Sequence, residues 1–178
     1  MDWRRNHLLV ISAVQCNYGE DSLEILRKHM VGRHFNTEQL FHLTSRKTCS
    51  WAYFNEREYG EALDNYIRES RKLGIREIFY LNTHSILPGT REEHPNWVQL
   101  DRNGNEIRAY SVDYLVCVNS RWFDEYAQTI RDLCSHDIDG IFIDGPVMHQ
   151  AGCFCSACKD KFQERSGAIR DESLRCDR

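Results

Sequence analysis

The chain has 178 residues, of which 41% are hydrophobic, so it can bury the core of one domain. Its formal net charge of -4 at pH 7 and the lack of a basic stripe argue against a nucleic-acid partner. The longest apolar run is far below the ~18 residues that a membrane span needs, so we expect no membrane partner either.

The N-terminus weakly imitates an export signal, because two arginines precede the apolar run 8–11. Ser12 interrupts this run, and Gln15 stands where a cleavage site needs a small residue, so we interpret the segment as a first strand. The chain also has eight cysteines, which in a secreted protein would suggest disulfides. Without an export signal, reduced thiols or a metal site are the better interpretation, and we expect a cytoplasmic protein.

From the N-terminus onward, strand patterns alternate with helix patterns. The apolar run 8–13 predicts a strand, and Ser22 is expected to cap a helix with apolar residues at every third or fourth position. Residues 39–43 predict the second strand, and the helix after it is expected to end at Gly74. The apolar stripes of these two helices are Leu23, Leu26 and Met30, and Ala62, Leu63, Tyr66, Ile67 and Leu73.

The third strand is predicted at 75–81, where Ile, Phe and Tyr favour β structure. The connection 83–119 is too long for an ordinary loop, and we expect it to contain a hairpin that turns at Asn103-Gly104. The remaining predicted elements are a helix after Ser120, a strand at 141–143 and a helix at 157–164. The stripe expected on the helix after Ser120 is Trp122, Phe123, Tyr126, Ala127, Ile130, Leu133 and Cys134.

These elements make four βα units. Apolar strands joined by helical crossovers indicate a parallel sheet covered by helices. An open doubly wound sheet and a (β/α)8 barrel both fit this α/β pattern. No Gly-x-Gly-x-x-Gly motif follows the first strand, which argues against a dinucleotide-binding sheet.

Asp144 directly follows the apolar strand 141–143, so its side chain is expected at the C-terminal edge of the sheet. Barrel enzymes keep their chemistry at this edge. Cleavage of a glycosidic bond needs two carboxyl groups, one to donate a proton and one to attack or to activate water. Asp144 is therefore the candidate catalytic carboxylate; the alternative is an Asp that caps the turn at Gly145-Pro146.

Further polar and aromatic side chains are expected near the same edge. Polar residues end the second and third strands or precede the third helix, where they can bond sugar hydroxyls. Aromatic rings in the loops can stack on the apolar faces of sugars, and Tyr53 and Tyr110 are further rings of this kind. The alternatives are structural hydrogen bonds, helix capping and loop packing. The candidate substrate-binding residues are His42, Trp51, Asn82, His84, Trp97 and Asn119.

Cys153, Cys155 and Cys158 form a C-x-C-x2-C cluster. Zinc prefers four tetrahedral ligands and binds thiolates readily, so this spacing suggests a zinc site. The fourth ligand would be Cys117, which precedes the third helix, or the nearby His149. A closed set of four ligands would be structural, because it leaves no open position for catalysis. The alternative is a group of free thiols.

Five segments are distinctive as a set, namely residues 82–84, 93–97, 117–120 and 139–144 and the cysteine cluster. Together they resemble the hypothetical glycosyl hydrolase family 6, whose members are TIM-barrel proteins. The resemblance covers roughly residues 60–162. It implies a carbohydrate substrate and glycoside hydrolase activity.

The cysteine pattern is similar to that of the family 42 β-galactosidases, in which one thiolate before a helix and three in a later C-x-C-x2-C hold zinc. This similarity implies that Cys117 is the fourth ligand of a structural zinc. Those enzymes end strand four with an Asn-Glu pair that supplies the acid/base, whereas this chain has Ile143-Asp144. Retaining barrel glycosidases that act on α-linkages place an Asp nucleophile after strand four, and the likeness to them implies this role for Asp144.

A TIM barrel needs eight strands and typically ~250 residues, whereas only four strands are predicted here. The resemblance thus implies that residues 1–178 form a single partial TIM-barrel domain, about the first four βα units. The second carboxylate would lie on a missing C-terminal half, and the fragment would be inactive alone or would associate with a partner, including a second copy. Two other hypotheses are a non-catalytic carbohydrate-binding or scaffold fragment with a zinc site, and a metal-dependent hydrolase with His42, His84 and Asp144 as ligands.

Overall fold

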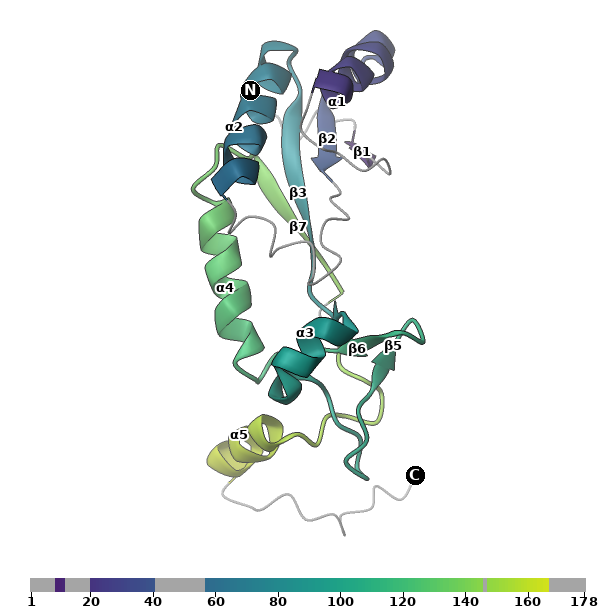
Figure 1. The fold of residues 1–178 in the computed structure, drawn as a ribbon, viewed down its shortest axis with the longest axis vertical. Helices are drawn as coiled ribbons and strands as arrows, with labels where there is room; N and C mark the ends of the chain where they lie inside the picture. The colour runs from purple at the N-terminus through teal and green to yellow at the C-terminus, as the bar shows by residue number, and fades with distance from the viewer. Residues whose placement is uncertain (1–8, 12–19, 41–56, 146, 167–178) are drawn as a thin grey trace. The chain divides into compact units, whose positions relative to one another are not determined.

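The computed structural model describes residues 9–11, 20–40, 57–145 and 147–166 (Figure 1). These residues divide into two compact units. The first unit contains the described residues up to Asn82 together with 128–144. The second contains 83–127 and the described residues from Gly145 onward. The candidate sugar-binding residues His42 and Trp51, and Tyr53, lie outside the described residues.

The first unit is built on a four-stranded parallel sheet. Its strands in spatial order are β1 (Leu9–Ile11), β2 (Thr37–Leu40), β3 (Arg76–Asn82) and β7 (Gly140–Asp144). Spatial order follows chain order, and each neighbouring pair is parallel. Parallel neighbours need long crossover connections, which here contain the helices. The predicted α/β class with a parallel sheet is therefore confirmed.

Helix α2 (Arg57–Lys72) packs against β3. Leu63, Tyr66 and Ile67 on the predicted apolar stripe are buried. On β3 the residues alternate between buried and half-buried, as expected for a strand with one face under a helix. Gly74 follows α2 with φ +79, a left-handed conformation that glycine adopts without strain, so the predicted stop is confirmed.

The N-terminal helical segment starts earlier than its sequence pattern suggested. Helix α1 (Glu20–Ile25) already includes Ser22, so the prediction that Ser22 caps it is wrong. Glu20 and Asp21 occupy the first turn, where the helix dipole favours negative charge. A π-helical turn η2 (Leu26–Met30) and a 3-10 turn η3 (Val31–Arg33) follow, and the predicted apolar residues are buried.

Helix α4 (Trp122–Leu133) has a narrower buried stripe than the sequence suggested. Trp122, Tyr126 and Leu133 are buried, whereas Phe123 is 54% exposed and Cys134 is exposed. The two exposed residues each lie one position beyond a buried one, a rotation of about 100° around the helix axis. The predictions that they belong to the core are therefore wrong.

The second unit contains a three-stranded antiparallel sheet of β4 (Ser85–Ile86), β6 (Asp113–Leu115) and β5 (Arg108–Ala109), in that order. A hairpin precedes β5, with an antiparallel bridge between Leu100 and Glu106. Gly104 turns this hairpin with φ +85, which confirms the predicted Asn-Gly turn. The pairing of β6 with both neighbouring strands was not predicted.

Besides the first half of α4, three helical segments lie in the described part of the second unit. They are α3 (Pro88–Glu93), the 3-10 turn η5 (Pro95–Trp97) and α5 (Ser156–Ser166). Helix α5 includes the predicted range 157–164 and is slightly longer at each end. Within the described ranges, no helix is long and apolar enough to span a bilayer.

A buried pair of carboxyl groups lies between β2 and β3. Glu38 and Glu77 are direct partners across the two strands, and they are 4% and 0% exposed. The Tyr66 hydroxyl of α2 donates a hydrogen bond of 2.7 Å to Glu38 Oε2. Burial, together with the charge of Glu38, raises the pKa of the Glu77 carboxyl well above its usual value. The first unit therefore folds best with Glu77 protonated.

This pair predicts a pH-dependent stability. Because the pKa of Glu77 is higher in the folded state, its favourable contribution is fully present below about pH 4.5 and is lost as the pH rises through the raised pKa. Glu77→Gln mimics the protonated acid and should raise Tm at pH 8 by a few degrees, with little change at pH 4. Circular dichroism melts at both pH values test this, with the exposed Glu92→Gln as control. An equal shift at both pH values would contradict it.

Candidate functional site

The C-terminal edge of the parallel sheet brings three polar side chains together. Asp144 is the last residue of β7, and its direct partner across the ladder is Asn82, the last residue of β3. Tyr80 lies two residues before Asn82, so its side chain emerges on the same face. The Tyr80 hydroxyl donates a hydrogen bond to Asp144 Oδ2. The predicted strand-end position of Asp144 is thereby observed.

This face of β3 is the one turned away from α2. Phe79 and Leu81 lie on the opposite face of β3 and are fully buried, whereas Tyr80, Asn82 and Asp144 remain half-buried. The Asp144 carboxylate is thus held by Tyr80 but still accessible. Chemically it offers one of the two carboxyl groups that glycosidic cleavage requires.

Tyr80 is a site residue that the sequence did not reveal. It was expected only as a β-favouring strand residue, and its hydrogen bond depends on the pairing of β3 with β7. The signal available in the sequence is its spacing of two from Asn82, which places both on one face of a strand. That spacing does not show which residue of another strand lies opposite.

In the second unit, His84 is buried beside Tyr110. His84 is 6% exposed, and its Nε2 lies 2.6 Å from the Tyr110 hydroxyl. Tyr110 and Ser111 both have positive φ values, 52° and 68°, which are unfavourable for residues with a Cβ. Burial raises the pKa of the nearby Asp113 carboxyl, and the charge of His84 opposes this. The strained turn therefore holds the phenol of Tyr110 against a buried imidazole.

Gly145 leaves no room for a side chain next to this imidazole. Its φ is +61, and an added Cβ would lie 2.7 Å from His84 Nδ1. We expect Gly145→Ala to lower the free energy of unfolding by about 1–3 kcal/mol, through backbone strain and displacement of His84. Chemical denaturation measures this.

Gly104→Ala is the matched control, because Gly104 also has positive φ, +85, but has no atom within 4 Å of an added Cβ. The loss of unfolding free energy in Gly145→Ala beyond that in Gly104→Ala measures the effect of the contact with His84. Equal costs for the two variants would show that His84 is not displaced.

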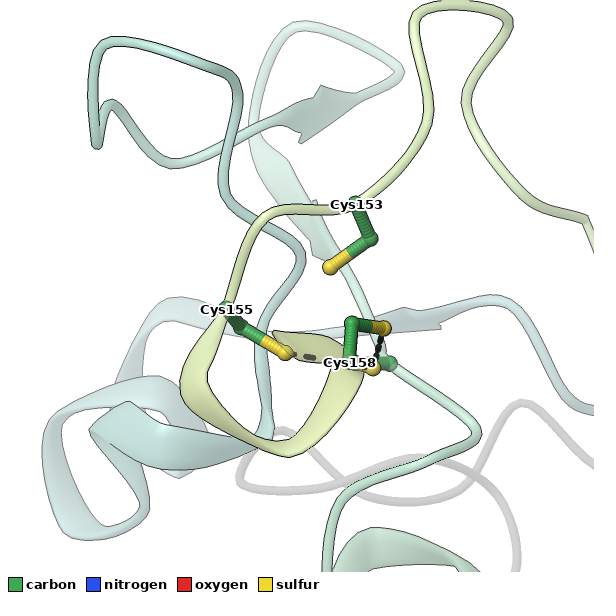
Figure 2. A group of neighbouring side chains, drawn as sticks. Cys153, Cys155 and Cys158 are labelled. Atoms are coloured by element: carbon green, nitrogen blue, oxygen red, sulfur yellow. Dashed lines mark hydrogen bonds between the residues drawn. The ribbon is translucent and has the colours of Figure 1, made fainter. Parts of the chain in front are cut away.

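The four cysteines Cys117, Cys153, Cys155 and Cys158 form a compact buried group. Each is at most 6% exposed, and their sulfur atoms all lie within 4.8 Å of one another. Cys117 Sγ is 3.4 Å from Cys158 Sγ and 3.5 Å from Cys155 Sγ. Figure 2 shows the side chains of the C-x-C-x2-C segment pointing toward one another. Cys117 rather than His149 completes the group, as the resemblance implied.

These distances fit a tetrahedral metal ion. Bonds of about 2.3 Å from a zinc ion to four thiolates would separate the sulfurs by roughly 3.8 Å. Small movements of the side chains would therefore close the site. Among the described residues this is the one group of His, Cys, Asp or Glu side chains with metal-binding geometry.

The thiols cannot all ionise without a cation. Hydrogen bonds from Cys117 and Cys155 lower the pKa of Cys153 to about 2. Hydrogen bonds to Cys153 and Cys155, together with burial, raise the pKa of Cys117 far above its usual value. Ionisation of Cys153 is thus favoured while ionisation of Cys117 is disfavoured. A divalent cation would supply positive charge to stabilise four thiolates together.

The neighbouring backbone and side chains orient this group. Asn119 Nδ2 donates to Cys158 Sγ at 3.2 Å, and Lys161 donates to the other end of the Asn119 amide at 3.3 Å. The structure therefore places Asn119, a candidate sugar ligand, next to the cysteines.

Trp97, another candidate, is 9% exposed and stacks on the His94 ring, with ring centroids 3.8 Å apart.

Solved structures with a similar fold include glycosidases. A noncanonic maltogenic alpha-amylase from Thermotoga neapolitana matches with a TM-score of 0.58 at 18% identity, covering 80% of this chain and 40% of that chain. The beta-galactosidase of the haloarchaeon Halorubrum lacusprofundi gives 0.58 at 18%, covering 92% and 25%. Gan42B, a GH42 beta-galactosidase from G. stearothermophilus, gives 0.53 at 19%, covering 80% and 20%.

At these identities the matches show the fold alone. The chain has an α/β fold with a parallel sheet that matches parts of glycosidase TIM-barrel domains, and it spans between 20% and 40% of the length of these three proteins. No curated protein matches the sequence. The family model for hypothetical glycosyl hydrolase 6 matches residues 30–145, more than half of the chain. The chain therefore belongs to the hypothetical glycosyl hydrolase 6 family.

Proposed function

We propose that residues 1–178 are part of a glycoside hydrolase catalytic barrel, about its first four βα units, and that Asp144 is a catalytic carboxylate for cleavage of O-glycosidic bonds. The observation that carries this proposal is the place of Asp144 at the end of β7, opposite Asn82 and hydrogen-bonded by Tyr80. In (β/α)8 enzymes the C-terminal ends of the strands supply the catalytic groups. Family membership and the fold of the matched glycosidases support the same reaction class.

In this proposal Asp144 attacks the anomeric carbon as the nucleophile. The hydrogen bond from Tyr80 holds one oxygen of the Asp144 carboxylate. Attack by the carboxylate forms a bond to the anomeric carbon as the glycosidic bond to the leaving group breaks. Asn82, on the same face, is suited to bond a sugar hydroxyl, because its amide both donates and accepts. Cleavage also needs an acid/base carboxyl group, and we assign it to a later strand of the same barrel.

Asp144→Asn tests this role in the longest native polypeptide that includes these residues. The substrates are nitrophenyl α- and β-glycosides. We expect kcat to fall at least about a thousandfold, about 4 kcal/mol of transition-state stabilisation, because the amide cannot attack as a carboxylate does. Asp160→Asn, an exposed acid of α5, should keep full activity. Unchanged turnover in the Asp144 variant would remove this residue from the mechanism.

We further propose that the four cysteines bind one zinc ion as a structural centre. Buried thiolates at tetrahedral spacing suit zinc, and a set of four protein ligands leaves no position for substrate. The centre would join residue 117, ahead of α4, to the segment 153–158 at the start of α5. Its contribution is to fold stability, since ligands of this kind bind metal only when the chain brings them together.

Cys155→Ser tests the centre. Zinc measured by elemental analysis should fall from about one ion per chain to well below one, and Tm should fall with it, because three thiolates hold the ion less tightly. Cys134→Ser removes an exposed thiol outside the group and should leave both quantities unchanged. Equal zinc content in the two variants would refute the site.

A further inference from the structure

The second unit contains a pocket that the proposed catalytic group does not use. It has a volume of about 390 Å³ and is lined by residues 93–97, 120–121 and 156–157. This volume lies within the range of small-molecule pockets, roughly 300–1,000 Å³. Residues 93–97 are one of the distinctive segments of the sequence, and Trp97 was the one residue among them with a predicted role, as a sugar-binding ring.

All three walls are tied to the cysteine group. Ser120 Oγ donates to the Cys117 carbonyl at 2.7 Å, and the Cys117 N–H donates to the Trp97 carbonyl at 2.7 Å. Ser156 and Ala157 lie between Cys155 and Cys158 in the chain. A metal ion that draws the four sulfurs together would therefore fix the three walls relative to one another.

The wall formed by 93–97 carries an aromatic platform. The rings of His94 and Trp97 are parallel within 5°, with centroids 3.8 Å apart. Trp97 is buried and His94 is half-buried, so the imidazole is the accessible ring. A flat ring supported from behind by an indole is suited to contact the apolar face of a sugar.

The polar lining is mixed and electrically balanced. Glu93 offers an acceptor, Arg121 offers donors, and Asn96 and Ser156 offer both. All four are exposed and accessible to a ligand. The start of α5 and Arg121 would favour an anion, but the Glu93 carboxylate opposes it. A neutral molecule rich in hydroxyls satisfies both signs of charge.

We propose that this pocket binds a neutral sugar ring, stacked on His94 and hydrogen-bonded by Asn96 and Arg121, and that the metal-loaded cysteine centre holds the pocket in shape. The inference rests on the proposed function for its class of ligand and for its metal. It does not require that the chain cleaves the sugar, so binding and cleavage can fail independently.

The test is isothermal titration of the metal-loaded chain with glucose, galactose and maltose, with glucuronate and inorganic phosphate as charged probes. We expect saturable binding of at least one neutral sugar, with the charged probes weaker. His94→Ala and Arg121→Ala should each weaken binding at least tenfold. Arg165→Ala, an exposed arginine of α5 outside the pocket, should not. Circular dichroism checks that the His94, Arg121 and Arg165 variants stay folded.

Removal of the metal by a chelator should reduce sugar binding in parallel with metal content. The proposal is overturned by the absence of saturable neutral-sugar binding, by tighter binding of glucuronate or phosphate, or by equal affinities of the Arg121 and Arg165 variants. Sugar binding by this chain, together with unchanged glycoside turnover of the Asp144→Asn variant in the longest native polypeptide, would instead contradict the proposed catalytic role and leave the pocket standing. Sugar binding that survives complete metal loss would overturn the link to the cysteine centre.

Discussion

Four thiol sulfurs buried within 4.8 Å of one another are the strongest constraint in the second unit. Buried thiolates repel one another, and each is costly in a low-dielectric surrounding, so this packing is favourable only with a cation or with most of the protons retained. Backbone hydrogen bonds connect the cysteine group to neighbouring segments. The Cys117 N–H donates to the Trp97 carbonyl, and the Phe154 N–H, just before α5, donates to the Leu100 carbonyl in the hairpin. The pocket and its aromatic wall depend on the same bonds.

The first unit depends on the register of its parallel sheet. Pairing of β3 with β7 sets Asn82 opposite Asp144, and the pleat then turns Tyr80 to the same face. If these strands were shifted by one residue, their side chains would exchange faces of the sheet. Tyr80, Asn82 and Asp144 would then be buried on the side covered by α2. Glu38 and Glu77 show the reverse case, since their register places two carboxyl groups on the helix-covered face, where at least one must stay neutral.

Particular residues show which features of the structure the sequence could predict and which it could not. The spacing of Leu63, Tyr66 and Ile67 predicted α2 and its buried face, and Gly74 predicted its end, because both signals are local. Ser22 was misjudged as a cap because two acidic residues before it can start the helix as well. Phe123 was misjudged as core because hydrophobic character alone does not show which flank of a stripe meets other elements. The hydrogen bond from Tyr80 and the stack of His94 on Trp97 were not predicted, since each depends on contacts made in the folded chain.

The amino-acid sequence by itself determined the alternation of strands and helices, the strand-end position of Asp144 and the three cysteines of the C-x-C-x2-C cluster. These features follow from periodicity and from spacing over a few residues, and such local signals are present in the sequence before any tertiary contact forms. Only the tertiary structure decided that Cys117 joins the other three, that Tyr80 holds Asp144, and that the segments 93–97, 120–121 and 156–157 enclose a pocket. The reason is physical: contacts between distant segments depend on strand register and on the packing of whole elements, and no short stretch of sequence contains either.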